Sequence, residues 1–170
     1  MTVHADAKVS IEPAAGAGDM ALVHGLFVEY ADWLDFDLCF QGFDEELATL
    51  PGKYAPPDGG LWLARVGGAL AGVVGLRPLD PGVCELKRLW VRPDCRGHGL
   101  GRRLTQTAIE AARAAGYRSM RLDTIGGLMQ EARALYESLG FKETAPYYRN
   151  PHPGADYMEL DLDAGGASEP

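Results

Sequence analysis

Hydrophobic and polar positions along the chain follow two periods, one typical of strands and one typical of helices. Alternating or continuous apolar stretches bounded by glycine or proline predict strands at residues 9–14, 60–66, 69–79, 83–91, 117–124, 141–145 and 155–162. Apolar residues spaced three or four apart predict helices at residues 19–37, 43–50, 100–116 and 127–140. The predicted order of elements is therefore β-α-α-β-β-β-α-β-α-β-β.

This order predicts the fold class, which is α/β of the α+β kind. Consecutive strands joined by a short turn, as at Gly67-Gly68, form antiparallel hairpins, whereas strands joined through a helix run parallel. We expect a mixed, mostly antiparallel sheet of about six to seven strands with helices on both faces. The length fits a single domain over residues 1–170, whose ends, residues 1–7 and 164–170, we expect to be mobile tails.

Composition and charge narrow the classes of partner. The formal net charge is −8, which argues against nucleic-acid binding, since such binding requires a basic face. No apolar run approaches the roughly 20 residues needed to cross a bilayer, so we expect no membrane partner. Three cysteines without a CxxC spacing indicate free thiols in a reducing compartment, and hence a cytoplasmic protein. The histidines are scattered without zinc-ligand spacing, so no metal is expected.

The segment VRPDCRGHGLGRRL (residues 91–104) joins a predicted strand to a predicted helix and carries glycine at three alternate positions. The first amides of a helix lack intrahelical partners, and the helix dipole favours an anion beside them. Glycine keeps these amides open, because a Cβ would hold a pyrophosphate away from the backbone. The arginines of the segment add positive charge. The sequence therefore predicts a phosphate-binding site at this loop.

Two common phosphate-binding patterns do not fit this loop. GxGxxG fails because an arginine stands where the third glycine is required, and GxxxxGK[ST] occurs nowhere. The loop does fit R/Q-x-x-G-x-G/A through Arg96, Gly99 and Gly101, and ALYESLGFKE (134–143) fits L-Y-x-x-x-G-F. With both motifs in this order of elements, residues 8–162 resemble the GNAT superfamily of N-acetyltransferases. The alternative is a structural turn that is rich in glycine for packing alone.

The resemblance implies an acyltransferase that uses acetyl-CoA as cosubstrate. Members of the family bind the pyrophosphate on this loop and pair the pantetheine arm with the edge of the preceding strand, in a slot between splayed parallel central strands. The implied cofactor-binding residues are Leu89, Val91, Arg96, Gly97, His98, Gly99, Leu100, Gly101, Arg102 and Thr124. Many members carry an asparagine seven residues before the motif tyrosine, where this chain has Met129. One cofactor contact of the family is therefore missing or replaced.

Acetyl transfer to an amine requires a base for the ammonium proton and an acid for the departing thiolate. Tyr136 occupies the family's tyrosine position in LYESLGF, which implies the role of acid near the sulfur of CoA. Glu85 precedes Val91 on the strand 83–91 at an offset similar to that of the family's glutamate base. A regular strand places Glu85 and Val91 on one face, whereas a bulge, common here in the family, breaks that parity. A glutamate paired with a neighbouring cation, and a chain of water molecules as the base, are the alternatives.

The acceptor pocket is implied by resemblance to lie between the first helices and the loop between the last two strands. Tyr30 on the first helix, and Tyr147 and Tyr148 in the loop 146–155, are the candidate substrate-binding residues. A tyrosine side chain stacks through its ring and forms hydrogen bonds through its hydroxyl, which suits the recognition of a small acceptor.

Charge around this pocket leaves the acceptor open. The acidic residues between Glu29 and Glu46 form either a solvated face or a rim that attracts a cationic amine, whereas Arg149 suits an acceptor with a carboxylate. We expect direct transfer, in a ternary complex, to the primary amine of a small molecule. Protein N-terminal or lysine acetylation, and a non-catalytic CoA-binding regulatory module, are the alternatives. A homodimer is expected only because dimers are common in the family.

Overall fold

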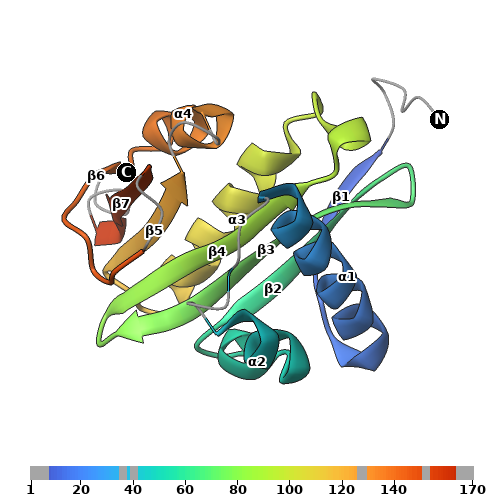
Figure 1. The fold of residues 1–170 in the computed structure, drawn as a ribbon, viewed down its shortest axis with the longest axis horizontal. Coiled ribbons are helices and arrows are strands. Elements are labelled where there is room, and N and C mark those ends of the chain that lie inside the picture. The colour runs from blue at the N-terminus through green and yellow to red at the C-terminus, as the bar shows by residue number, and fades with distance from the viewer. Residues whose placement is uncertain (1–7, 35–37, 39–41, 126–129, 151–153, 164–170) are drawn as a thin grey trace.

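The computed structural model describes residues 8–34, 38, 42–125, 130–150 and 154–163 (Figure 1). The strands are β1 (Val9–Pro13), β2 (Gly60–Val66), β3 (Ala69–Asp80), β4 (Val83–Val91), β5 (Ser119–Ile125), β6 (Lys142–Glu143) and β7 (Ala155–Asp161). The helices are α1 (Gly16–Leu34), α2 (Phe43–Ala48), α3 (Leu100–Ala114) and α4 (Gln130–Ser138). Short 3₁₀ turns at Gly52–Tyr54 and Pro93–Cys95 were not predicted. The expected tails, residues 1–7 and 164–170, lie outside the described residues, as does Met129.

The strands form one seven-stranded sheet in the order β1-β2-β3-β4-β5-β7-β6. Neighbouring strands are antiparallel everywhere except between β4 and β5, which run parallel. The fold class and the mostly antiparallel sheet are therefore confirmed. The largest difference lies at the end of the chain, where the predicted strand 141–145 is reduced to Lys142–Glu143.

The helices cover the sheet from both sides (Figure 1). Helices α1 and α2 lie on one face, while α3 and α4 lie on the other. Leu26 and Phe27 of α1 are fully buried in the core of the first face, and Leu104 and Ala108 of α3 in the core of the second. Helix α1 begins at Gly16, before the predicted start at Asp19. The Asp19 carboxylate reaches back and accepts a hydrogen bond of 3.0 Å from the N–H of Ala15, the residue just before the helix.

The parallel strands β4 and β5 stay together over a short distance only. Their pairing runs from Val83 with Ser119 to Glu85 with Arg121. Beyond that point β4 continues to pair with β3, and β5 continues to pair with β7. The two strands therefore diverge, as the resemblance implied, and their divergence opens a cleft in the middle of the sheet.

Strand β4 carries a bulge at Arg88. Gly75 of β3 pairs with Lys87, whereas Val73 pairs with Trp90, so β4 contains one residue more than β3 across this interval. Arg88 has a φ of 60°, the only positive φ of a non-glycine residue in the described part of the chain. The regular alternation expected along β4 is therefore broken at this point.

Candidate active site

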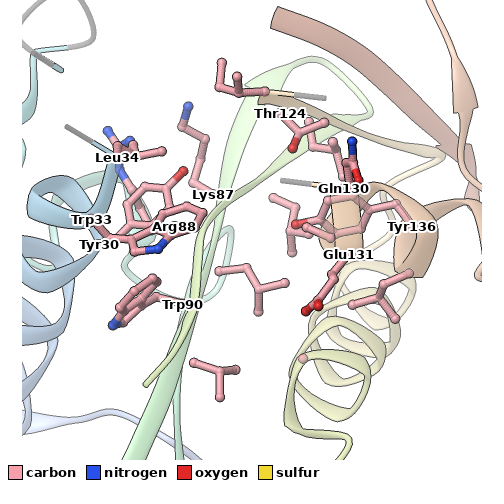
Figure 2. Close-up of a pocket in the computed structure, with 18 of the residues that line it drawn as sticks. Tyr30, Trp33, Leu34, Lys87, Arg88, Trp90, Thr124, Gln130, Glu131 and Tyr136 are labelled. Carbon is pink, nitrogen blue, oxygen red and sulfur yellow. The ribbon is translucent and has the colours of Figure 1, made fainter. Parts of the chain in front are cut away.

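The cleft between β4 and β5 is a cavity of about 650 Å³ that extends from α1 on one side to α3 and α4 on the other (Figure 2). Of the residues implied to bind the cofactor, those that line it are Leu89, Val91, Arg96, Gly97, Gly99, Leu100, Gly101, Arg102 and Thr124. His98 is not among the lining side chains. Tyr136 and Tyr30 line the cavity, whereas Glu85, Tyr147 and Tyr148 do not.

The glycine turn opens the start of α3 toward the cleft. Gly97 and Gly99 have φ values of 91° and 71°, in the left-handed region that glycine adopts without strain. A Cβ built at either position meets no protein atom within 4 Å, so both main chains border open space. Gly99 is the N-cap and supplies no side-chain cap, which leaves the first amides of α3 without a side-chain acceptor from the cap residue. This end of the cleft can hold an anion.

Two arginines flank the turn. Arg96 donates from Nε to the carbonyl of Val91 at 3.1 Å, and its guanidinium lies 5.2 Å from the ring centroid of Trp90. Arg102 donates from Nη2 to Ser138 Oγ at 2.7 Å, which ties α3 to α4. Both arginines line the cleft, where their positive charge favours a negatively charged group.

Beyond Glu85, the edge of β4 that faces β5 pairs with no described strand, and its Val91 carbonyl accepts the hydrogen bond from Arg96. The N–H of Arg92 donates to the carbonyl of Ala71 at 2.8 Å, so Arg92 and Ala71 form a hydrogen-bonded antiparallel pair. Main-chain groups alternate in direction along a strand, so those of Leu89 and Val91 point away from β3 and toward the cleft. This edge can pair with an extended ligand as a neighbouring strand would.

Tyr136 lies on α4, and its buried side chain forms part of the wall opposite β4 (Figure 2). Its ring packs against Phe141 at 5.6 Å between centroids. Burial, together with the nearby Tyr30 and Asp123, raises the pKa of Tyr136 above its usual value, so its phenol is protonated at neutral pH. At neutral pH the side chain is therefore a hydrogen-bond donor into the cleft, and its raised pKa makes it a weaker acid than a free phenol.

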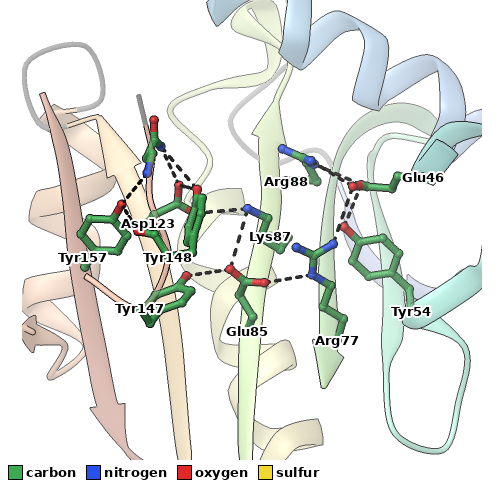
Figure 3. Close-up of polar contacts among 11 residues, drawn as sticks. Glu46, Tyr54, Arg77, Glu85, Lys87, Arg88, Asp123, Tyr147, Tyr148 and Tyr157 are labelled. Carbon is green, nitrogen blue, oxygen red and sulfur yellow. Dashed lines mark hydrogen bonds and ion pairs between the residues drawn. The ribbon is translucent and has the colours of Figure 1, made fainter. Parts of the chain in front are cut away.

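Glu85 lies behind the cleft rather than in its lining. Its side chain is 2% exposed and accepts hydrogen bonds from Arg77 Nε at 2.9 Å and from the hydroxyl of Tyr147 at 2.6 Å. Lys87 Nζ lies 3.8 Å from its second oxygen. These contacts agree with one alternative left open by the sequence, a glutamate paired with a neighbouring cation. Between Glu85 and the cleft lies Lys87, which lines the cavity (Figure 3).

Sequence reasoning missed a buried ion pair at the closed end of the cleft. Lys87 Nζ lies 3.2 Å from Asp123 Oδ1, and both side chains line the cavity. Asp123 also accepts hydrogen bonds from the Tyr148 hydroxyl and from Asn150 Nδ2 (Figure 3). Burial lowers the pKa of Lys87, against the opposing effect of the carboxylates of Asp123 and Glu85. The available signal was the presence of charged residues inside two largely apolar strands, Lys87 in LKRLW and Asp123 in MRLDT.

The pKa of Asp123 results from opposing influences. Burial on its own raises the pKa of this carboxyl, but the charge of Lys87 and the hydrogen bonds from Tyr148, Lys87 and Asn150 outweigh it and leave the pKa below its usual value. Asp123 is therefore ionised at neutral pH. The hydroxyl of Tyr148 donates to this carboxylate, and the hydroxyl of Tyr147 donates to Glu85; their binding of a substrate stays a prediction.

The wall of the cleft on the α1 side is aromatic and aliphatic. It is formed by Tyr30, Trp33, Leu34, Leu38 and Trp90. Trp33 is 37% exposed, the only large hydrophobic side chain so exposed in the described part of the chain. Two residues of the acidic run are paired with arginines instead: Glu29 pairs with Arg92 at 2.7 Å and Glu46 pairs with Arg88 at 2.9 Å, while Asp35 and Asp37 lie outside the described residues.

Comparison with known proteins agrees with this geometry. Residues 27–141 match the family model of the acetyltransferase (GNAT) family. The chain is 45% identical over 139 residues to an uncharacterized N-acetyltransferase of Schizosaccharomyces pombe, covering 81% of this chain and 85% of the relative. The fold resembles that of a GNAT-family acetyltransferase of Staphylococcus aureus, with a TM-score of 0.74, 19% identity and coverage of 91% and 99% of the two chains. It also resembles a Bacillus subtilis acetyltransferase in complex with CoA, with a TM-score of 0.62, 23% identity and coverage of 91% and 99%.

The chain belongs to the acetyltransferase (GNAT) family. Membership confirms the class of enzyme that the two motifs implied, an acetyl-CoA-dependent acyltransferase. No helix in the described ranges is both long and apolar enough to pass through a membrane. Within the same ranges, no three His, Cys, Asp or Glu side chains gather in a way that could hold a metal ion.

Proposed function

We propose that this protein transfers an acetyl group from acetyl-CoA to the primary amine of a small molecule, within a ternary complex in the cleft. One observation carries the proposal: the amides at the start of α3, the open edge of β4 and the phenol of Tyr136 all face one cavity. An anion site, a strand edge and a proton donor in that order match the diphosphate, the amide-containing arm and the sulfur of acetyl-CoA.

In this proposal, residues at one end of the cleft bind the diphosphate, and residues at the other end take part in acetyl transfer. The turn from Arg96 to Arg102 binds the diphosphate through main-chain amides and the flanking guanidinium groups. The main chain of Leu89 and Val91 binds the arm and donates toward the carbonyl oxygen of the thioester, whose negative charge grows during attack. Tyr136 donates its phenol proton to the departing thiolate, since the phenol is protonated at neutral pH. Burial raises the pKa of this phenol, so the phenolate left behind takes back a proton from the water that received the acceptor's proton.

The acceptor's proton leaves by an indirect route in this proposal. Contact between Glu85 and an amine in the cleft would require both Lys87 and Tyr147 to move, since these side chains already contact its carboxylate. Water in the cleft therefore takes the proton, and Glu85 acts behind Lys87 as the electrostatic support of that route. The acceptor lies against the α1 wall, where Tyr30 and Trp33 offer aromatic faces.

The test is the release of free thiol from acetyl-CoA, measured with a panel of amines. The panel contains polyamines, arylalkylamines, amino acids, and peptides with a free N-terminus or a lysine. Turnover with a small amine, with the acetylated product identified by mass spectrometry, supports the proposal. Turnover with peptides alone would favour the protein acetyltransferase instead, and saturable CoA binding without turnover on any amine would favour a binding module. The cytoplasmic location and the homodimer stay predictions.

A further inference from the structure

The bulge in β4 is held in an unusual backbone conformation. An L-residue other than glycine rarely adopts a φ of 60°, because its Cβ crowds the neighbouring carbonyl. Arg88 adopts it while almost completely buried, at 4% exposure. Such a conformation persists only where surrounding contacts hold it, so the contacts of Arg88 identify what stabilises the bulge.

Those contacts come from α2, which carries Glu46 (Figure 3). The Arg88 guanidinium donates from Nε to Glu46 at 3.1 Å and from Nη2 to its other carboxylate oxygen at 2.9 Å. The guanidinium also lies 5.0 Å from the ring centroid of Phe43. Glu46 accepts a further hydrogen bond of 2.8 Å from the hydroxyl of Tyr54 and lies 3.7 Å from Arg77. Glu46 is therefore fixed from several directions and in turn fixes Arg88.

The bulge decides which groups of β4 face the cleft. One extra residue reverses the alternation of the strand beyond it. With the bulge, the side chain of Leu89 packs with that of Leu86 on the α3 side, and Trp90 packs on the α1 side. The amide of Leu89 then points to the open edge of the strand, away from β3. Without the bulge, the same amide would point toward β3 and be lost to a ligand in the cleft.

We propose that Glu46 and Arg88 are positioning residues, which hold the β4 bulge so that the Leu89 amide donates into the cleft. The expected effect on the reaction rests on the proposed function. The direction of the Leu89 amide can be tested without it. The diphosphate-binding turn lies beyond the end of β4, so loss of the pair should lower kcat and leave the affinity for CoA nearly unchanged. A pair that served stability alone would produce no such separation.

The first experiment removes the negative charge of Glu46 by replacing its carboxylate with an amide. Glu46→Gln should lower kcat by at least about 10-fold, since loss of a single donor to a developing oxyanion costs about 10²- to 10³-fold and the bulge is only partly lost. The Kd for CoA should change less than about threefold. Glu159→Gln is the control, because Glu159 forms an ion pair of 2.5 Å with Arg121, between β7 and β5, and neither side chain lines the cleft. Its kcat should stay within about twofold of the wild type.

The second experiment separates the backbone of Arg88 from its side chain. Two variants are compared in the Glu46→Gln background, Arg88→Gly and Arg88→Ala, and both lack the guanidinium. The backbone at position 88 can keep its positive φ without strain in the first variant, whereas the Cβ of the second variant disfavours that φ. The glycine variant should show a kcat about 10-fold above that of the alanine variant. Equal kcat values in the two variants would overturn the proposal, because the side chain rather than the bulge would then matter.

Amide hydrogen exchange of Leu89, followed by NMR, gives a readout that needs no turnover. The Leu89 amide should exchange fast in the wild type and in the Glu46→Gln/Arg88→Gly variant, and should be protected in Glu46→Gln/Arg88→Ala, where it turns toward β3. The same exchange in all three proteins would contradict the inference. Should the wild type bind CoA but turn over no amine, the proposed function fails while the exchange result still decides the role of Glu46 and Arg88.

Discussion

Replacing Gly99 by alanine tests whether the turn before α3 binds the diphosphate. At φ 71° an alanine costs about 1 kcal/mol more than glycine, which for a domain of this size lowers Tm by about 2–4 °C. The added methyl group meets no protein atom within 4 Å and projects into the cleft, so it removes space beside the first amides of α3. The loss of one hydrogen bond to a charged phosphate oxygen costs about 1.5–3 kcal/mol, so the Kd for CoA should rise about 10- to 100-fold.

Gly116, just past the other end of α3, offers a matched control. Its φ is 91°, and a Cβ there also meets no atom within 4 Å, but Gly116 does not line the cleft. Gly116→Ala should therefore lose about as much stability as Gly99→Ala and keep the wild-type affinity for CoA. Calorimetric titration with CoA and thermal unfolding of both variants provide the measurements. Equal affinities in the two variants would refute the reasoning, since the diphosphate could not then lie against Gly99.

Three further predictions follow from the site. Tyr136→Phe should lower kcat about 10²-fold or more while the Kd for CoA stays unchanged; an unaltered kcat would remove Tyr136 as the acid. Lys87→Met should reduce the free energy of unfolding in urea by about 3–5 kcal/mol, because it leaves Asp123 buried without its counter-charge, whereas Lys142→Met on the exposed β6 should change it by less than about 0.5 kcal/mol. The folded-state pKa of Asp123 is depressed, so its contribution to stability is present above the unfolded value of about 3.9 and is lost as pH falls through the folded value. Stability of Asp123→Asn should accordingly fall less steeply than that of the wild type between about pH 5 and 3, and parallel curves would contradict this assignment.

The sequence predicted the fold well because its strongest signals are local. The hairpin of β2 and β3 is marked by Gly67 and Gly68 between two apolar runs, and the observed turn lies there. Strand β4 has the bounds that its apolar pattern predicted. The motif around Gly99 identified the start of α3, because a left-handed glycine before a helix is a requirement of the backbone itself.

Contacts between distant segments escaped prediction. The pairing of Lys87 with Asp123 joins two strands whose charges read as ordinary surface residues in a linear sequence. The hydroxyls of Tyr147 and Tyr148 donate to the buried carboxylates of Glu85 and Asp123, contacts across 62 and 25 residues that no local pattern indicates. The resemblance left a bulge in this strand open, but the contact of Arg88 with Glu46, 42 residues earlier, could not be read from any local pattern.

The most direct test is a crystal structure of the protein with CoA bound. The diphosphate should lie within about 3 Å of main-chain amides between Gly97 and Arg102, and the pantetheine arm should run along the open edge of β4 past Leu89 toward Tyr136. Density for the diphosphate on the α1 side of the cleft, or anywhere away from the start of α3, would contradict the assignment of this turn as the cofactor-binding site.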